Sequence, residues 1–204
     1  MPYDPLKDFT PIVRTVDVNY VLVVHPSVPV KSVHELIAYA KANPGKLSYG
    51  SAGSGSLPHL GTELFKAQTG TSMVHVPYKG GGPMVTDLLG GTIDMMITDT
   101  ATGIPQVKAG KVRALGVTAT KRSPLAPDLP TMAEAGLPGF DISTWYGFFA
   151  PAGTPPAVVA KWNAEVAKIL NAPDVRAKFV ADGAEPAPNS PGEFAQFIAR
   201  EQAK

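Results

Sequence analysis

The sequence contains no cysteine, which excludes disulfides, thiolate metal ligands and a cysteine nucleophile. It also lacks a strong charge of either sign, because the formal net charge is +1 and charged residues make up 17% of the chain. Without a run of lysine and arginine, we predict no nucleic acid partner. The longest apolar run, residues 20–24 (YVLVV), is far too short to span a bilayer.

The first residues lack the features of a secretory signal peptide. Residues 1–5 (MPYDP) contain no basic segment, no apolar stretch and no small-residue cleavage site. From this segment we expect either a cytosolic protein or a mature or shortened form of a longer one.

Glycine and proline are frequent, with 20 and 21 residues, and they separate apolar runs from amphipathic segments. Residues 20–24 predict a buried strand, and residues 157–171 predict the most regular helix, with Trp162 facing the core. Strands that alternate with helices predict an α/β fold with a mainly parallel sheet. The other strands are predicted at residues 47–49, 73–76, 93–97, 113–118 and 143–149, and the other helices at 33–42, 57–68, 83–89, 105–109, 174–181 and 191–202.

The first candidate binding loop is the glycine- and serine-rich stretch at residues 50–56 (GSAGSGS), between a predicted strand and a predicted helix. Glycines allow the backbone to approach a ligand, and the helix N-terminus supplies N–H groups and a positive dipole end that suit an anion. The spacing fits neither the Walker loop nor the dinucleotide fingerprint. A turn that only caps the helix is the open alternative.

Two further loops follow predicted strands. Residues 78–83 (YKGGGP) repeat the order of strand, glycines and helix start, with a positive charge on Lys79. A solvated lysine on a surface turn is the alternative. Asp99, at the end of the strand before Thr100, either accepts from a ligand or caps the following turn.

Enzymatic interpretations have weaker support. His59 lies close in sequence to the serines of the first loop, but no strand–Gly-x-Ser-x-Gly elbow is present, and no two histidines have metal-ligand spacing. Glu63 and Asp87 are expected to be solvated or capping. Trp145 and Tyr146, at a predicted strand end, either line a cleft or pack in the core.

Several segments together resemble a known family. They are residues 49–59 (YGSAGSGSLPH), 74–80 (VHVPYKG), 90–94 (GGTID), 108–115 (KAGKVRAL), 130–136 (PTMAEAG), 145–155 (WYGFFAPAGTP) and 2–9 (PYDPLKDF). In this collinear order the chain resembles the Bug-type solute-binding proteins of tripartite tricarboxylate transporters over essentially its whole length.

The resemblance implies an α/β fold of the periplasmic-binding-protein type II kind, with two lobes and mainly parallel sheets. A central ligand-binding lobe is expected at residues 27–143, and the discontinuous outer lobe at residues 1–26 and 144–204. The implied function is periplasmic capture of a small organic acid, such as a di- or tricarboxylate, an amino acid or an aromatic acid, for a membrane permease. No enzymatic activity, cofactor or metal is implied. Ligand sensing with the same cleft and, less favoured, a Ser/His hydrolase are the alternatives.

When the motifs of the family are matched to this sequence, the expected ligand-binding residues lie in three loops and at one strand end. They are Ser51, Gly53, Ser54, Gly55, Ser56, His59, Tyr78, Lys79, Gly80, Asp99, Thr100, Trp145 and Tyr146. The family's first outer-lobe segment has no counterpart here, so we expect an incomplete outer lobe with uncovered apolar faces. Self-association is an expected way to cover them.

Overall fold

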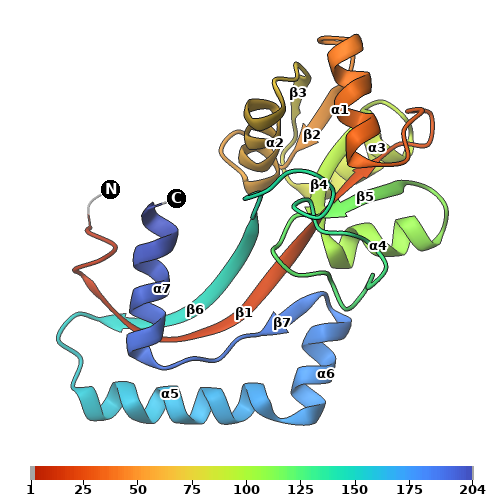
Figure 1. Ribbon diagram of the computed structural model, residues 1–204. Coiled ribbons are helices and arrows are strands. Elements are labelled where there is room, and N and C mark those ends of the chain that lie inside the picture. The colour runs from red at the N-terminus through yellow and green to blue at the C-terminus, as the bar shows by residue number, and fades with distance from the viewer. Residues whose placement is uncertain (1–2, 204) are drawn as a thin grey trace. The chain divides into compact units, whose positions relative to one another are not determined.

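Residues 3–203, which the computed structural model describes, divide into two units (Figure 1). Unit 1 comprises the chain up to Val18 and from Trp145 onward, and unit 2 comprises Asn19–Thr144, so the first strand contributes to both units. In chain order the elements are β1 (Phe9–Val24), α1 (Val33–Ala42), β2 (Ser48–Ser51), α2 (Leu57–Thr69), β3 (Val74–Pro77), α3 (Gly81–Leu89), β4 (Met95–Asp99), α4 (Thr100–Lys108), β5 (Arg113–Val117), β6 (Ser143–Pro151), α5 (Pro156–Asn171), α6 (Pro173–Ala181), β7 (Ala184–Pro186) and α7 (Pro191–Ala203).

Unit 2 is built on strands in the order β3-β2-β4-β1-β5. β2 runs parallel to β3 and β4, whereas β1 runs antiparallel to β4 and β5. β2, β3, β4 and β5 therefore share one direction, and β1 runs against them. The predicted mainly parallel arrangement is found in this unit, because α2, α3 and α4 each return the chain to the start of the next strand.

Helices cover both faces of this sheet. Alternate residues of a strand point to opposite faces, and each face forms its own apolar cluster with helices. Leu22 and Ile97 belong to the apolar cluster that includes residues of α1 and α2. Val23 and Met96 belong to the cluster that includes residues of α3 and α4. The predicted buried strand at residues 20–24 is confirmed, since the last four side chains of β1 are fully buried.

Unit 1 contains the first half of β1, which pairs with β6 and runs antiparallel to β7. The three-residue β7 was not predicted, because its sequence (AEP) has no β-branched or aromatic residue. Ile12 and Val13 of β1 form a small apolar cluster with Val159 of α5. A second group consists of the aromatic rings of Trp145, Phe149, Phe194 and Phe197.

Helix α5 departs from its predicted packing. The inward position predicted for Trp162 is wrong, because this side chain is 54% exposed. Val158 and Ile169 are 44% and 56% exposed, whereas Val159 and Leu170 are buried. The helix packs its Val159 and Val166 side against β1, whereas Val158, Trp162 and Ile169 stay exposed in the part of the chain described. Periodicity identifies an apolar side of a helix but not whether another element covers it.

Two elements begin at least five residues before their predicted starts. β1 begins at Phe9, although Arg14 and Asp17 interrupt its apolar pattern; these two side chains form an ion pair at 3.5 Å. α4 begins at Thr100, directly after β4, and Pro105 lies inside it. Proline is common in a first helical turn, which is why the sequence predicts a helix that starts at Pro105.

Substitution of Gly103 by alanine is expected to destabilise unit 2 by about 1–3 kcal/mol. A β-carbon at this position of α4 would lie 2.7 Å from Val21 Cγ1 and 3.0 Å from Thr98 Cγ2, so the helix would have to move away from the sheet. Gly82→Ala is the matched control, because Gly82 is also helical and no heavy atom lies within 4 Å of its β-carbon position. Urea unfolding measures both variants, and equal stabilities would contradict the close packing of α4.

Candidate functional site

Three strands of unit 2 end at one edge of the sheet. The parallel strands β2, β3 and β4 end at Ser51, Pro77 and Asp99, and Ser51 lies opposite Pro77 in the β2–β3 register. α2, α3 and α4 begin after these ends. Since parallel strands place their carboxyl ends together, the three predicted loops and three helix N-termini lie along the same edge.

The loop at residues 50–56 folds as a tight turn around two glycines. Gly53 and Gly55 have φ values of +123° and +81°, which glycine adopts without strain. The N–H and the hydroxyl of Ser56 both donate to the carbonyl of Gly53, at 3.1 and 2.6 Å. Ser54 and Gly55 are exposed at the tip. The loop thus uses the Ser56 hydroxyl internally and presents the tip to solvent.

The N-termini of α2 and α3 differ from that of α4 in their capping. Ser56 at α2 makes no side-chain capping hydrogen bond, and Gly80 at α3 has no side chain to make one. At α4, Oδ1 of Asp99 accepts from the N–H of Thr102 at 2.8 Å. The first turns of α2 and α3 therefore lack a side-chain cap, and their N–H groups and positive dipole ends suit an anion. Asp99 therefore caps α4, which is one of the two roles expected from the sequence. The other role, a contact to a ligand, stays a prediction.

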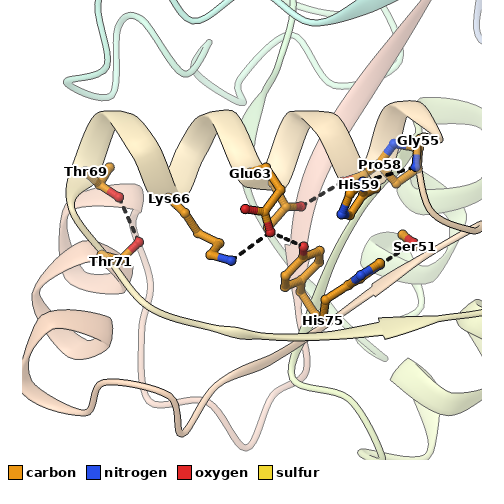
Figure 2. A network of polar contacts seen from close by, with 11 residues as sticks. Ser51, Gly55, Pro58, His59, Glu63, Lys66, Thr69, Thr71 and His75 are labelled. Carbon is orange, nitrogen blue, oxygen red and sulfur yellow. Dashed lines mark hydrogen bonds and ion pairs between the residues drawn. The ribbon is translucent and has the colours of Figure 1, made fainter.

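Two histidines support the first loop from within unit 2 (Figure 2). The fully buried Ser51 has its Oγ 2.7 Å from Nε2 of His75 and 3.1 Å from the carbonyl of Gly53. His59 stacks on His75 with ring centroids 4.3 Å apart, and its Nδ1 accepts from the N–H of Gly55 at 3.1 Å. Accepting at Nδ1 requires that this nitrogen carry no proton. The Ser51 and His59 side chains thus hold the loop in shape.

The same network continues along α2 through Glu63 and Lys66 (Figure 2). Oε1 of Glu63 accepts from Lys66 Nζ at 2.7 Å and from the Tyr49 hydroxyl at 2.5 Å. The hydrogen bond from Lys66, followed by that from Tyr49, lowers the pKa of Glu63. Burial, followed by the charge of His59, lowers the pKa of His75. Glu63, expected to be solvated or capping, is partly exposed, with 42% of its side chain accessible, and is also held by Tyr49 and Lys66.

Sequence reasoning overlooked this network, although part of its signal was present. His59 and Glu63 are four residues apart and so share one face of α2. Tyr49 and His75 occupy paired positions of the parallel strands β2 and β3, and their rings stack with centroids 4.9 Å apart. The register that joins the two pairs was not derivable from the separate motifs.

Tyr78 ties the second loop to the first. Its N–H donates to the carbonyl of Ser51 at 2.9 Å, and its hydroxyl donates to Oδ2 of Asp87 at 2.7 Å, so the partly exposed Asp87 has a protein partner. Burial, followed by the hydrogen bond to Asp87, raises the pKa of Tyr78 to about 12, which keeps the phenol protonated at neutral pH. The adjacent Lys79 is exposed, and Gly80 has a φ of +109°. This loop therefore adds a positive charge to the sheet edge.

The remaining predicted site residues lie in other settings. Thr100 is the buried first residue of α4. Trp145 and Tyr146 belong to unit 1, whereas the residues of the three loops belong to unit 2. The ring of Trp145 meets Phe194 and Phe197 edge-on, with centroids 5.6 and 5.4 Å apart, which is the packing alternative for this residue. Tyr146 is 55% exposed.

Within residues 3–203, no group of three or more histidine, aspartate or glutamate side chains is placed to hold a metal ion. In the same range, none of the helices combines the length and the apolar character that crossing a membrane requires.

Comparison with known proteins identifies a family match over the whole chain. The family model of the tripartite tricarboxylate transporter family receptor, TctC, matches residues 1–204. The chain is 46% identical over 176 residues to the UPF0065 protein in the tcbD-tcbE intergenic region of Pseudomonas sp. strain P51, covering 86% of this chain and 52% of that protein. It is 38% identical over 201 residues to BugT of Bordetella pertussis, covering 98% of this chain and 62% of that protein. The chain thus spans somewhat more than half the length of these curated relatives.

Solved structures share the fold. An R. palustris protein solved with adipate has a TM-score of 0.87 and 42% identity, covering 100% of this chain and 68% of that one. MatC from Rhodopseudomonas palustris, solved with bound malate, has a TM-score of 0.82 and 36% identity, covering 98% of this chain and 69% of that one. These similarities confirm the predicted α/β fold of the periplasmic-binding-protein type II kind.

Acidification is expected to destabilise unit 2 through His75. Its pKa is lowered from 6.5 in the folded protein, so as the pH falls below this value the unfolded chain takes up a proton that the folded chain resists. Stability is therefore full above pH 6.5 and declines as the pH falls toward the lowered pKa. Urea unfolding between mildly alkaline and mildly acidic pH measures this slope.

His75→Gln is expected to flatten the acid slope of the free energy of unfolding. His34→Gln is the matched control, because His34 is exposed on α1 and outside the network. If His34→Gln flattened the slope as much as His75→Gln, the pH dependence of stability would not arise from His75.

Proposed function

The chain belongs to the tripartite tricarboxylate transporter receptor family, and on this premise we propose that it captures a small carboxylate ligand. The proposed ligand-binding lobe is the central region at residues 27–143, which lies within unit 2. Residues 1–26 and 144–204 are the proposed second lobe. The family match and the chemistry of the loops in unit 2 support this proposal.

One observation carries the proposal of an anionic ligand. The N-termini of α2 and α3 lie at the same sheet edge, lack side-chain caps and begin after exposed glycine-containing loops. Backbone N–H groups at residue 54 and at residues 80–82, together with the ammonium of Lys79, suit a carboxylate. A dicarboxylate is the proposed class, because two relatives were solved with adipate and malate.

A binding role is favoured over catalysis. Ser51 and His75 have the 2.7 Å separation of a nucleophile and its base. However, Ser51 is fully buried, and its hydroxyl also contacts the backbone of Gly53. We propose that this pair shapes the loop and that the protein is not an enzyme. The alternative of a Ser/His hydrolase gains no support from this geometry.

Capture in the periplasm and delivery to a membrane permease complete the proposal. Two similar structures are described as a periplasmic transporter and as the periplasmic binding protein BugD. The family itself is described as a receptor of a transporter. No cofactor or metal is part of the proposal, because the groups at the loop edge are sufficient to bind a carboxylate.

Adipate, malate and citrate are the probes that test the proposed ligand class. A ligand at a thousandfold excess over its dissociation constant is expected to stabilise the folded chain by about 4 kcal/mol. Thermal unfolding and calorimetric titration measure this effect. Adipamide, the neutral diamide of adipate, should give none, because it lacks the charge that the helix N-termini favour.

Lys79→Gln is expected to weaken binding of the dicarboxylate by about tenfold to a hundredfold, since it removes a charged hydrogen bond donor. Lys46→Gln is the matched control, because Lys46 is exposed and precedes β2 at the opposite end of the strand. Stabilisation by adipamide as strong as by adipate, or no stabilisation by any of the carboxylates, would contradict the proposed function.

A further inference from the structure

One hydrogen bond at the tip of the first loop depends on a proton. The N–H of Gly55 donates to Nδ1 of His59 at 3.1 Å (Figure 2). A ring nitrogen of histidine accepts only while it carries no proton, and the charged ring is a donor at both nitrogens. A proton taken up by His59 therefore replaces a donor and its acceptor with two donors that face each other, the N–H of Gly55 and the Nδ1–H of the ring.

The loop tip has room to adapt to this change. Ser54 and Gly55 are exposed, and Gly55 has a φ of +81°, which glycine adopts without strain. In the described part of the chain, no heavy atom lies within 4 Å of the β-carbon position of Gly55. The ring of His59 is partly exposed, so it can exchange protons with solvent. Two donors at such a tip suit the oxygens of a carboxylate.

The charged and titratable groups around the His59 ring come from α2, β2 and β3. His75 of β3 stacks on it, and burial lowers the pKa of His75, which leaves His59 as the ring that takes up a proton. Glu63 of α2 attracts a proton to His59, whereas its partner Lys66 and the positive dipole end of α2 oppose one. The Tyr49 phenol of β2 stays neutral, because burial raises its pKa. A negative charge at the loop tip adds to the effect of Glu63 and favours the charged ring.

We propose that His59 takes up a proton when a carboxylate binds at the loop tip, so that ligand and proton are captured together. The carboxylate accepts from the N–H of Gly55 and from the Nδ1–H of His59, and its charge stabilises the charged ring. Because the coupling between two bound species is reciprocal, the affinity for the carboxylate rises as the pH falls. This inference rests on the proposed carboxylate ligand and adds a proton as the second species bound at the same site.

Calorimetric titration in buffers that differ in their enthalpy of ionisation counts the protons taken up with each ligand. The probe is adipate or malate, whichever the chain binds more tightly. The wild-type chain is expected to take up about half a proton or more near pH 7, because histidine changes its charge between about pH 5 and pH 8.

His59→Asn separates the hydrogen bond from the proton. The amide oxygen of asparagine is bonded to the same Cγ as Nδ1 and accepts from the N–H of Gly55, but it takes up no proton. This variant is expected to bind the ligand with almost no proton uptake. From about pH 8 to about pH 6, the affinity of the wild-type chain is expected to rise about tenfold relative to the variant, which corresponds to about one pKa unit of coupling. Titration of the ligand itself is common to both chains and cancels in this ratio.

His34→Asn is the matched control, because His34 is exposed on α1 and lies outside the network. It is expected to keep the proton uptake of the wild-type chain. Nitrogen NMR of the His59 ring gives an independent reading, since Nδ1 should be unprotonated in the free chain at about pH 7.5 and protonated in the complex. Circular dichroism checks that each variant is folded.

Equal proton uptake by the wild-type chain and His59→Asn would overturn this inference and leave the proposed function intact. The same holds for an affinity that falls, relative to the variant, as the pH is lowered. Absence of binding of adipate, malate and citrate at every pH would contradict the proposed function, and this inference with it.

Discussion

The burial of β1 between β4 and β5 is the constraint on which unit 2 depends. The last four side chains of this strand are fully buried and alternate between the two apolar clusters, so β1 contributes to the packing on both faces of the sheet. Its antiparallel register sets Tyr20 opposite Asp99 and Val24 opposite Met95. β4 in turn sets the position of β2 through Tyr49. These successive strand pairings determine where the sheet edge with the three loops lies.

Side chains and backbone have different tasks at that edge. The hydroxyls of Ser51 and Ser56, the ring of His59 and the phenol of Tyr78 are engaged with other protein groups. These side chains hold the loops in shape, whereas the N-termini of α2 and α3 have no side-chain caps. A site of this kind suits a carboxylate, because backbone N–H groups and helix dipoles favour negative charge without placing a counter-charge in the interior. Lys79 is the only predicted site residue that adds a cation.

The two units differ in how completely they bury their apolar residues. Unit 2 has two large clusters with helices on both faces of its sheet. The apolar cluster of unit 1 centres on Ile12, Val13 and Val159, while Trp162 on the same helix is exposed. Ligand capture is proposed for unit 2, where its physical basis is charge and hydrogen bonding.

Local sequence determined the elements of the central unit and its glycine-containing loops, because strand period, helix caps and turn residues act over a few residues. The collinear motifs also determined the family. The tertiary structure alone decided which partners these polar residues have: Glu63 accepts hydrogen bonds from Tyr49 and Lys66, and Asp99 caps α4. It also decided that Trp162 is exposed, although its spacing is typical of a core position. The physical reason is the same for all three residues. The partner of a side chain depends on which distant segment of the chain packs against it, and the periodicity of a single helix does not specify that segment.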